Sequence, residues 1–525
     1  MKSSDAIPGR ADVPFANQPS TATTAAEAAT FPWQPTGSKW VVALTVMLPA
    51  ALPLLNGTIV NVSLPYMQRS FDADVDHISW VLTSYLLSSG VVIPLTGWLA
   101  ARIGRRRYFL ISVAAFMITS ALCGAAKTLR AMIVFRFLQG AAGAAMVPTS
   151  QAILMEVFPP AEHALAMAVW GIGLMVAPVL GPTLGGWITE HLNWRWNFYI
   201  NLPAGALAFL MVREFIEDPP YLSKGRAASG RIDYVGILCL TLGLGLLQVV
   251  LDRGQRSGWF AALWVKAFTA SSLAFLLFLI VHELRVEDPV VDLRVFCNRS
   301  FSLAVSLVTI AVFVVFGVNL MNPLFLQLLL GYGPARAGYV VAVRGLGVMM
   351  SMMLVGQLSR MGYRTTRLVG LGFAIMAGAN WQMARWELHT SLRALMGPIF
   401  LSGVGAGMVF PNLSAVALSA VPRERIGFAA SLFNMMRNLG SAFGISAATN
   451  LLMSRKAAEY RTLLAHARVP SDVSARTALL LQIRQCADLR AFHTVYVTFA
   501  IIPLLLIVPL FWLKSDSYSE ANREE

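Results

Sequence analysis

Long apolar runs separated by short polar connections dominate the chain. Most runs extend over roughly 17 to 25 residues, the length that a helix needs to cross a bilayer. Membrane hydrocarbon satisfies no backbone polar group, so such runs must cross as helices or as strands of a closed barrel. The runs are continuous rather than alternating, which favours helices. Fourteen helices are predicted, at residues 40–60, 79–100, 108–126, 131–155, 164–188, 198–215, 234–251, 260–281, 302–330, 335–358, 367–384, 394–419, 428–453 and 493–513.

The predicted helices fall into groups of six, two and six, separated by two charged stretches. The first stretch runs from Arg213 to Asp233 and the second from His282 to Arg299. Neither is long enough for a soluble domain. The predicted organisation is a disordered tail at 1–38, a six-helix bundle at 39–216, two linker helices within 217–299, a second six-helix bundle at 300–514 and a tail at 515–525.

Composition and charge agree with a membrane protein. Hydrophobic residues make up 56% of the 525 residues and charged residues only 13%. The net charge of +14 comes from Lys and Arg scattered between apolar runs, which argues against nucleic-acid binding. Short connections on the N-terminal side are richer in Lys and Arg than the opposite ones, which predicts cytoplasmic termini in a bacterial inner membrane. Residues 1–38 lack the features of a cleaved signal.

The chain shows no pattern of an enzyme, a metal site or a cofactor site. Its four cysteines show neither close pairing nor metal-ligand spacing. Zinc-protease, nucleophile-elbow and phosphate-loop motifs are absent from the sequence. We therefore expect neither catalysis nor ATP-driven pumping.

The two groups of six helices share internal motifs. Gly97–Arg105 follows the second predicted helix and Gly356–Arg364 follows the tenth. Gly143–Pro148 in the fourth helix is similar to Gly405–Pro411 in the twelfth. Two related bundles place a transport site at their shared interface, which predicts alternating access.

Nine motifs in order resemble the fourteen-helix drug:proton antiporters of the major facilitator superfamily, of the EmrB/QacA type. They are Leu55–Pro65, Gly97–Arg107, Arg136–Gly140, Ala177–Gly186, Trp194–Pro203, Arg231–Asp233, Leu251–Gly254, Pro289–Leu293 and Arg344–Gly347. The resemblance covers about Trp40 to Leu513. It implies the major facilitator fold, export of drug-like compounds and, from the EmrB kind, a periplasmic adaptor with an outer-membrane channel. The connection from Arg455 to Arg490 is a candidate docking helix for that adaptor, or a simple capping loop.

Three arginines within apolar runs are candidate substrate residues. A charge at a helix centre costs about 2.5 to 3.5 kcal/mol and must face the bundle interior. Helix rise places Asn56 and Arg136 at similar depth, so we expect them to meet. An Arg that only bonds exposed carbonyls is the structural alternative. The predicted substrate and translocation residues are Asn56, Arg136, Gln139, Asn319, Arg344, Asn434 and Arg437.

Two motifs are candidate moving parts. The loop after the second helix could hold the neighbouring bundle in one state, or serve topology alone; its residues are Gly97, Arg102, Gly104, Arg105 and Arg106. The fifth helix carries a predicted hinge, with static tight packing as the alternative; its residues are Pro178, Gly181, Pro182, Gly185 and Gly186.

The sequence departs from the resemblance in its acids. Asn56 and Ala101 stand where family members often have a carboxylate. No Asp or Glu lies well inside an apolar run and no His is expected to be deep, so candidate proton-coupling residues are Glu156, Asp233 and Asp252 at helix ends. Arginines without acids attract anions, which predicts a weakly acidic amphipathic substrate. A transporter for one anionic metabolite or siderophore is the first alternative, and a membrane sensor without transport is the second.

Overall fold

In the computed structural model, the described residues are 37–219, 232–254, 257–286, 288–361, 363–467 and 473–513. Throughout these ranges the regular structure is helical. Apart from residues 37 and 38, the predicted N-terminal tail lies outside the described residues. The predicted tail at 515–525, and Arg231 of the Arg231–Asp233 motif, also lie outside them.

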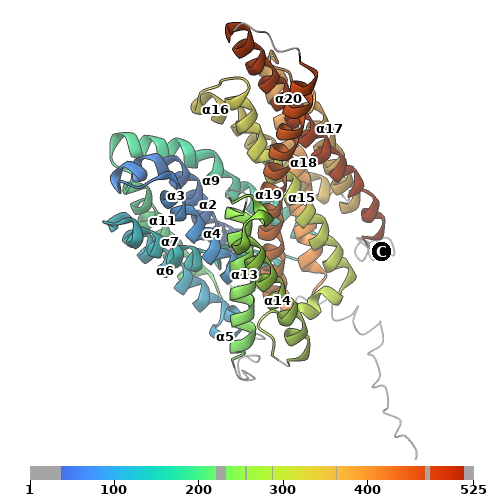
Figure 1. Ribbon diagram of the computed structural model, residues 1–525. Coiled ribbons are helices and arrows are strands. Elements are labelled where there is room, and N and C mark those ends of the chain that lie inside the picture. Colours follow the sequence, from blue (N-terminus) through green and yellow to red (C-terminus); the bar gives the residue numbers. More distant parts are fainter. Residues whose placement is uncertain are drawn as a thin grey trace, which may run out of the picture.

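The first bundle contains six long helical segments (Figure 1). They are α2 (Lys39–Ser70), α4 (Trp80–Val92) continued by η1 (Ile93–Leu95) and α5 (Thr96–Ile103), α6 (Arg105–Ala125), α7 (Leu129–Gly143) with α8 (Met146–Val157), α9 (His163–His191) and α11 (Asn201–Phe215). Short helices α3 (Val75–Ile78), η2 (Pro160–Glu162) and α10 (Trp196–Tyr199) lie between them.

The second bundle also contains six long helices, and two linker helices precede it. The linker pair is α13 (Tyr234–Arg253) and α14 (Leu263–Arg285), accompanied by η3 (Trp259–Ala261) and η4 (Leu293–Cys297). The bundle is α15 (Arg299–Leu328), α16 (Pro334–Arg360), α17 (Thr365–Met383), α18 (Leu392–Ser419), η5 (Arg423–Arg425), α19 (Ile426–His466), α20 (Val473–Leu505) and η6 (Val508–Trp512). Figure 1 shows the two bundles side by side, with the linker pair in front of them.

Eleven helical segments in the described ranges are long and apolar enough to cross a membrane. The three remaining long helices are α11, α17 and α19. The first has only 15 residues, and the other two contain Asn and Arg or Gln among their apolar positions. The order of six, two and six long helices is therefore present, while a count of fourteen crossings stays a prediction.

Side chains on the outside of the helices are largely apolar. Leu263 of α14 is 81% exposed and Phe511 of η6 is 87% exposed, which suits contact with lipid rather than water. Inside the bundles, glycines allow close helix packing. A Cβ on Gly440 of α19 would lie 2.4 Å from the Thr309 carbonyl oxygen of α15, so this crossing requires a residue without a side chain.

The linker pair lies against the line along which the two bundles meet. Helix α13 packs against α4 of the first bundle and α19 of the second. It joins α14 through the Ser272 hydroxyl, which donates to the Gly243 carbonyl at 2.7 Å. Any relative movement of α4 and α19 would therefore displace α13.

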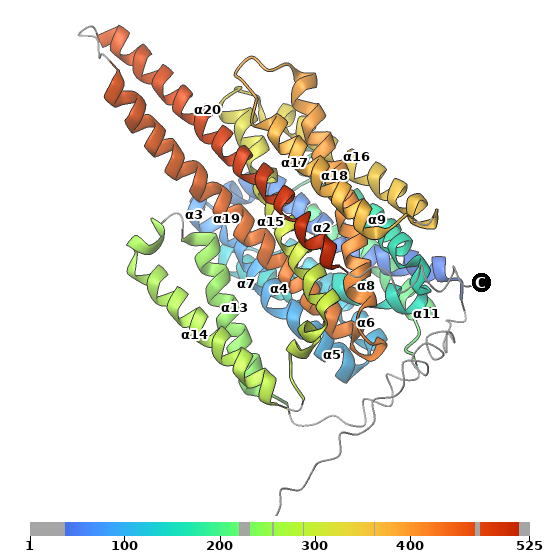
Figure 2. The ribbon, with the colours of Figure 1, turned by 90° about the vertical axis from the view of Figure 1, so that its right-hand side faces the viewer.

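The segment from Arg455 to Arg490 differs from the predicted separate surface helix or loop. Helix α19 continues without a break to His466 and α20 begins at Val473, and Figure 2 shows their far ends side by side beyond the rest of the molecule. Ion pairs join them, Lys456 to Asp488 at 2.8 Å and Arg490 to Glu459 at 3.4 Å. A prediction from apolar runs ends each helix where its apolar residues end. Here the helices continue beyond that point, and charged residues pair between them. We call this segment the helical hairpin.

Candidate functional site

A buried polar cluster lies in the first bundle around Gln139 of α7. The Arg136 guanidinium donates to Gln139 Oε1 at 2.8 Å, and Asn56 Nδ2 of α2 lies 3.4 Å from the same oxygen. Asn201 of α11 donates to Asn56 Oδ1 at 3.2 Å and to the Ser120 hydroxyl of α6 at 3.0 Å. Four helices thus meet at one set of hydrogen bonds, and Asn56 and Arg136 share Gln139 rather than bonding directly.

Arg136 is held on several sides. It is 1% exposed, and its Nε donates to the Val81 carbonyl at 3.0 Å. The Tyr85 ring centre lies 4.3 Å from the guanidinium carbon and that of Phe198 lies 5.9 Å away. Neutral acceptors and aromatic faces both stabilise a guanidinium out of water.

Asn201 and Asn197 were not predicted as site residues, although both lie in the Trp194–Pro203 motif. Asn197 donates to the hydroxyls of Ser63 at 2.5 Å and Thr189 at 2.6 Å. These bonds tie α10 to α2 and α9. Their signal in the sequence is weak, because an Asn next to a helix start is common in soluble loops and turns.

The second bundle contains fewer polar partners for its arginine. Arg344 of α16 is 8% exposed and donates to the Val315 carbonyl of α15 at 3.2 Å. Its Nη2 has no hydrogen-bond partner among the described residues. Asn319, which the sequence places in the same site, is exposed and lies on α15 four residues beyond Val315.

A polar contact joins the two bundles at α8 and α19. Asn434 Nδ2 donates to Gln151 Oε1 at 2.5 Å, and Arg437 donates to Asn434 Oδ1 at 3.3 Å. Arg437 is partly buried, less than Arg136 and Arg344 are. Gln151 was not predicted, because a single Gln in an apolar run has no spacing partner.

The Gly97–Arg107 loop contacts α19 of the other bundle through its glycine. A Cβ on Gly97 would lie 2.7 Å from the Phe428 Cα, so the two backbones are in direct contact. Gly104 has φ of 100°, a conformation that favours glycine. We call the side of the molecule that contains this loop the Gly104 end.

The arginines of the loop contact the first bundle and the segment that follows α11. Arg105 forms a buried ion pair with Glu156 of α8. The Arg106 backbone N–H donates to Asp218 at 2.8 Å, and its guanidinium donates to the Arg213 carbonyl. Arg102 stacks on Trp98 with 5.2 Å to the ring centre. The contact between this loop and α19 of the second bundle, described above, is made by Gly97.

The predicted hinge motif in α9 is packed tightly against α2. A Cβ on Gly181 would lie 2.0 Å from the Thr58 hydroxyl, and one on Gly185 would lie 3.1 Å from the Ile59 Cα. Gly186 is looser, with Val62 at 3.8 Å. Pro178 and Pro182 lie inside a continuous helix. These contacts describe close packing within one bundle, and hinge motion stays a prediction.

One histidine is buried at a helix end. His163 at the start of α9 is 5% exposed, and its Nδ1 lies 2.6 Å from the Ser419 hydroxyl of α18. Its Nε2 lies 3.0 Å from the carbonyls of Met155 and Phe158. The ring therefore joins the two bundles at the Gly104 end. The sequence did not single out His163, because it lies between Pro159–Pro160 and the start of an apolar run.

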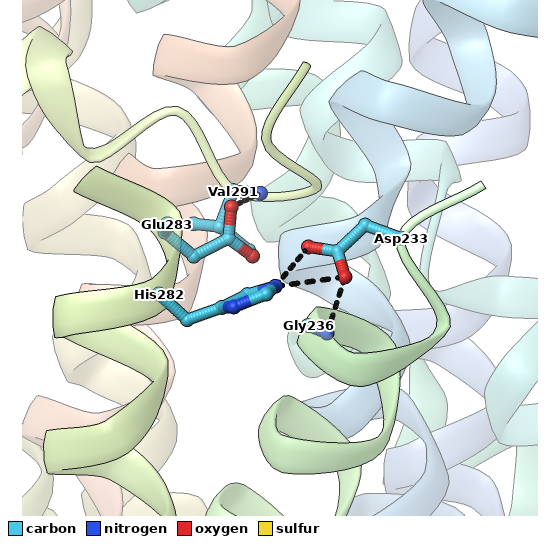
Figure 3. A network of polar contacts seen from close by, with 5 residues as sticks. All are labelled: Asp233, Gly236, His282, Glu283 and Val291. Atoms are coloured by element: carbon cyan, nitrogen blue, oxygen red, sulfur yellow. Dashed lines mark hydrogen bonds and ion pairs between the residues drawn. The ribbon is translucent and has the colours of Figure 1, made fainter. Parts of the chain in front are cut away.

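The three predicted proton-coupling acids lie at helix ends. Besides Glu156, Asp252 accepts from the Thr83 hydroxyl at 2.6 Å, and Asp233 lies 2.9 Å from His282 Nε2. The sequence did not single out Glu283, which is fully buried and lies in the last turn of α14 near Asp233 (Figure 3). In the described ranges no group of three His, Cys, Asp or Glu side chains has the arrangement of a metal site.

Two helical bundles with buried guanidinium groups, in contact with each other and flanked by a linker pair, define a membrane transport protein. The sequence signature of the Major Facilitator Superfamily matches residues 46–445, and the chain belongs to this superfamily.

Several relatives and solved structures are similar to the chain. The multidrug export protein EmrB of Escherichia coli K12 is 33% identical over 425 residues, which cover 81% of this chain and 82% of EmrB. The fatty acid resistance protein FarB of Neisseria gonorrhoeae is 34% identical over 452 residues, 86% of this chain and 87% of FarB. The human organic anion transporter MFSD10 has a TM-score of 0.63 at 17% identity, with 90% of this chain and 100% of MFSD10 covered, which shows the shared fold.

Proposed function

We propose that the protein exports small amphipathic compounds across the bacterial inner membrane by alternating access, drives this export with protons, and prefers substrates with a negative charge. The names of relatives support export, since EmrB is a multidrug export protein and FarB a fatty acid resistance protein. On this proposal the protein performs transport without a catalytic step.

The charge distribution carries the proposal on substrate class. Within the described ranges, the buried acidic residues are Glu156, Glu283 and Asp292, and the side chain of Asp233 is 7% exposed. All four lie at helix ends. Arg136 and Arg344, in contrast, lie well inside α7 and α16. A low-dielectric interior with fixed guanidinium groups attracts an anionic head group and repels a cation. Apolar side chains around it suit an amphipathic tail.

The contacts between the bundles support alternating access. Gly97 meets Phe428, His163 meets Ser419, and Gln151 meets Asn434. The first two lie at the Gly104 end, which the distribution of Lys and Arg assigns to the cytoplasm. On this proposal the structure represents a state closed to the cytoplasm, and export requires these contacts to separate and form again once per cycle.

A transport assay tests the proposal directly. Proteoliposomes that contain the purified protein are supplied with taurocholate, a permanently anionic amphiphile, or with ethidium, a cation. A pH gradient is then imposed across their membrane. We expect gradient-dependent movement of taurocholate that exceeds that of ethidium by about tenfold or more. Movement of ethidium alone would contradict the substrate class. Taurocholate movement that does not depend on the pH gradient would contradict proton-driven export.

The helical hairpin is the proposed docking surface for a periplasmic adaptor that leads to an outer-membrane channel. With both termini in the cytoplasm, the hairpin would extend into the periplasm, and its ion pairs hold it straight. Site-specific photocrosslinking from exposed Leu481 in whole cells tests this. We expect a crosslinked product when the photocrosslinker is at Leu481. The same photocrosslinker at Leu210, an exposed residue in the lipid-facing part of α11, is the control and should give no such product.

A further inference from the structure

The linker helices contain a polar cluster at the Gly104 end that the transport site does not use (Figure 3). Asp233 precedes α13, and its Oδ1 accepts from the Gly236 N–H at 2.8 Å. His282 Nε2, on the last turn of α14, lies 2.9 Å from both oxygens of Asp233. The Asp233 side chain is only 7% exposed. The His282 side chain is 23% exposed, so the cluster joins the two linker helices with its carboxylates largely shielded from bulk water.

Glu283 completes this cluster with one oxygen unpaired. The residue is 0% exposed, and its Oε2 accepts from the Val291 N–H at 3.3 Å. Its Oε1 has no hydrogen-bond partner among the described residues, and Figure 3 shows this oxygen on the side that faces Asp233. A Cβ on Gly236 would lie 2.8 Å from Glu283 Oε1 and 2.4 Å from Asp233 Oδ2. The two carboxyl groups thus converge above one glycine.

The charges around Glu283 leave Oε1 without a cation. Its charged neighbours are Asp233 from α13 and His282 from its own helix, and the His282 ring is engaged by Asp233. In the segment after α14, Arg294 donates to the Val286 carbonyl, while Arg425 from the α18–α19 turn pairs with Asp292. An ionised carboxylate out of water requires donors at both oxygens. A proton on Oε1 removes that requirement.

The cluster is connected to the moving parts of the fold. Val291 immediately precedes Asp292, which is 3.3 Å from Arg425 at the turn into α19. Asn298 donates to the Ala420 carbonyl at the end of α18 at 2.7 Å. Helix α19 in turn meets Gly97 of the first bundle, and α13 packs on α4 and α19. A change at Glu283 would therefore reach the place where the bundles separate.

We propose that the Asp233–His282–Glu283 cluster is a proton-binding site in which Glu283 takes up and releases the coupled proton, and that this exchange controls the attachment of the linker pair to the α18–α19 turn. This inference rests on the proposed proton-driven export. It places a proton site outside the two bundles, in a chain that has Asn56 in place of a first-helix acid.

Infrared difference spectroscopy of the purified full-length protein tests proton binding without any substrate. As the pH is raised, wild type should lose the carbonyl stretch of one buried carboxylic acid. The band should be absent in Glu283→Gln and unchanged in Glu387→Gln, the same substitution at an exposed glutamate. Survival of the band in Glu283→Gln would overturn the proposal. Glu283→Asp should keep a titrating band, which distinguishes loss of the proton site from misfolding.

Transport of taurocholate separates this inference from the proposed function. In Glu283→Gln, gradient-driven accumulation should fall by about tenfold or more, while exchange of labelled for unlabelled taurocholate without a gradient should stay within about twofold. Glu387→Gln should retain both activities, and Glu283→Asp should regain part of the first. Full gradient-driven transport in Glu283→Gln would overturn the proton site and leave export intact. Taurocholate movement driven equally by a Na⁺ gradient would also overturn it.

Discussion

Each bundle has an arginine inside one of its helices, Arg136 in α7 and Arg344 in α16, and the two side chains have different surroundings. Arg136 has a carbonyl, a glutamine oxygen and two aromatic rings around it. Among the described residues, Arg344 has the Val315 carbonyl as an acceptor and an Nη2 without a hydrogen-bond partner. Related folds thus use the same residue type for two purposes. We propose that the guanidinium of the first bundle holds helices together and that the guanidinium of the second keeps a donor free for an anion.

Replacement of Arg136 by alanine gives the largest expected effect on stability. It removes a charged donor from the Val81 carbonyl and from Gln139 Oε1, a loss of about 1.5–3 kcal/mol for each hydrogen bond. We expect a clear fall in the thermal unfolding midpoint of the detergent-purified protein, and a smaller fall for Arg136→Lys. An alanine variant as stable as wild type would show that Arg136 is not the structural member of the pair.

Arg344→Ala should affect substrate affinity rather than stability. A charge-assisted hydrogen bond contributes about 1.5–3 kcal/mol, so the concentration of taurocholate that half-saturates transport should rise by about tenfold to a hundredfold. The unfolding midpoint should change less than in Arg136→Ala. Arg344→Lys, which keeps the charge, should lose less affinity; an unchanged half-saturating concentration in Arg344→Ala would contradict the free-donor role.

A pair of asparagines sharpens the comparison further. Asn201 in the first bundle donates to both Asn56 and Ser120, whereas Asn380 in the second donates to the Phe499 carbonyl alone. Asn201→Leu should therefore destabilise by about 2 kcal/mol and Asn380→Leu by about 1 kcal/mol. Chemical unfolding of both variants in parallel measures the difference, and the reverse order would contradict a denser network in the first bundle.

Ser419→Ala should give the smallest effect, because it removes one hydrogen bond between the bundles. The closed Gly104 end would lose about 1 kcal/mol. A cysteine introduced at buried Ser431, in a background without the native cysteines, should react about fivefold faster with a membrane-impermeant maleimide. Ser414→Ala, whose hydroxyl bonds within its own helix to Phe410, serves as the control. Equal rates in both variants would show that the His163–Ser419 contact does not hold this end closed.

The sequence predicted the helical organisation because apolar run length reports directly on a membrane span. It also found Arg136 and Arg344, since an isolated charge in an apolar run stands out. Other features depend on the tertiary arrangement. Glu283 follows His282 at a helix end and looks like an ordinary interfacial acid, until the fold brings Asp233 and Val291 beside it. Gln151 gains a role only when Asn434, 283 residues away, packs against it.

The helical hairpin shows a second limit. An apolar criterion could not extend α19 to His466, because the pairs Lys456–Asp488 and Arg490–Glu459 connect two helices that are distant in sequence at the membrane surface. Similarly, depth along a helix brought Asn56 and Arg136 together but could not identify Asn201. Partners from other helices are set by packing angles, which a hydropathy pattern does not contain.

Calorimetric titration of taurocholate into detergent-purified wild type, Arg344→Ala and Arg344→Lys tests most directly that the second bundle supplies the anion site. We expect taurocholate to bind wild type, with a dissociation constant about tenfold or more higher in Arg344→Ala and an intermediate value in Arg344→Lys. Ethidium in the same titration should bind more weakly than taurocholate to wild type. Equal taurocholate affinity in wild type and Arg344→Ala would contradict the account.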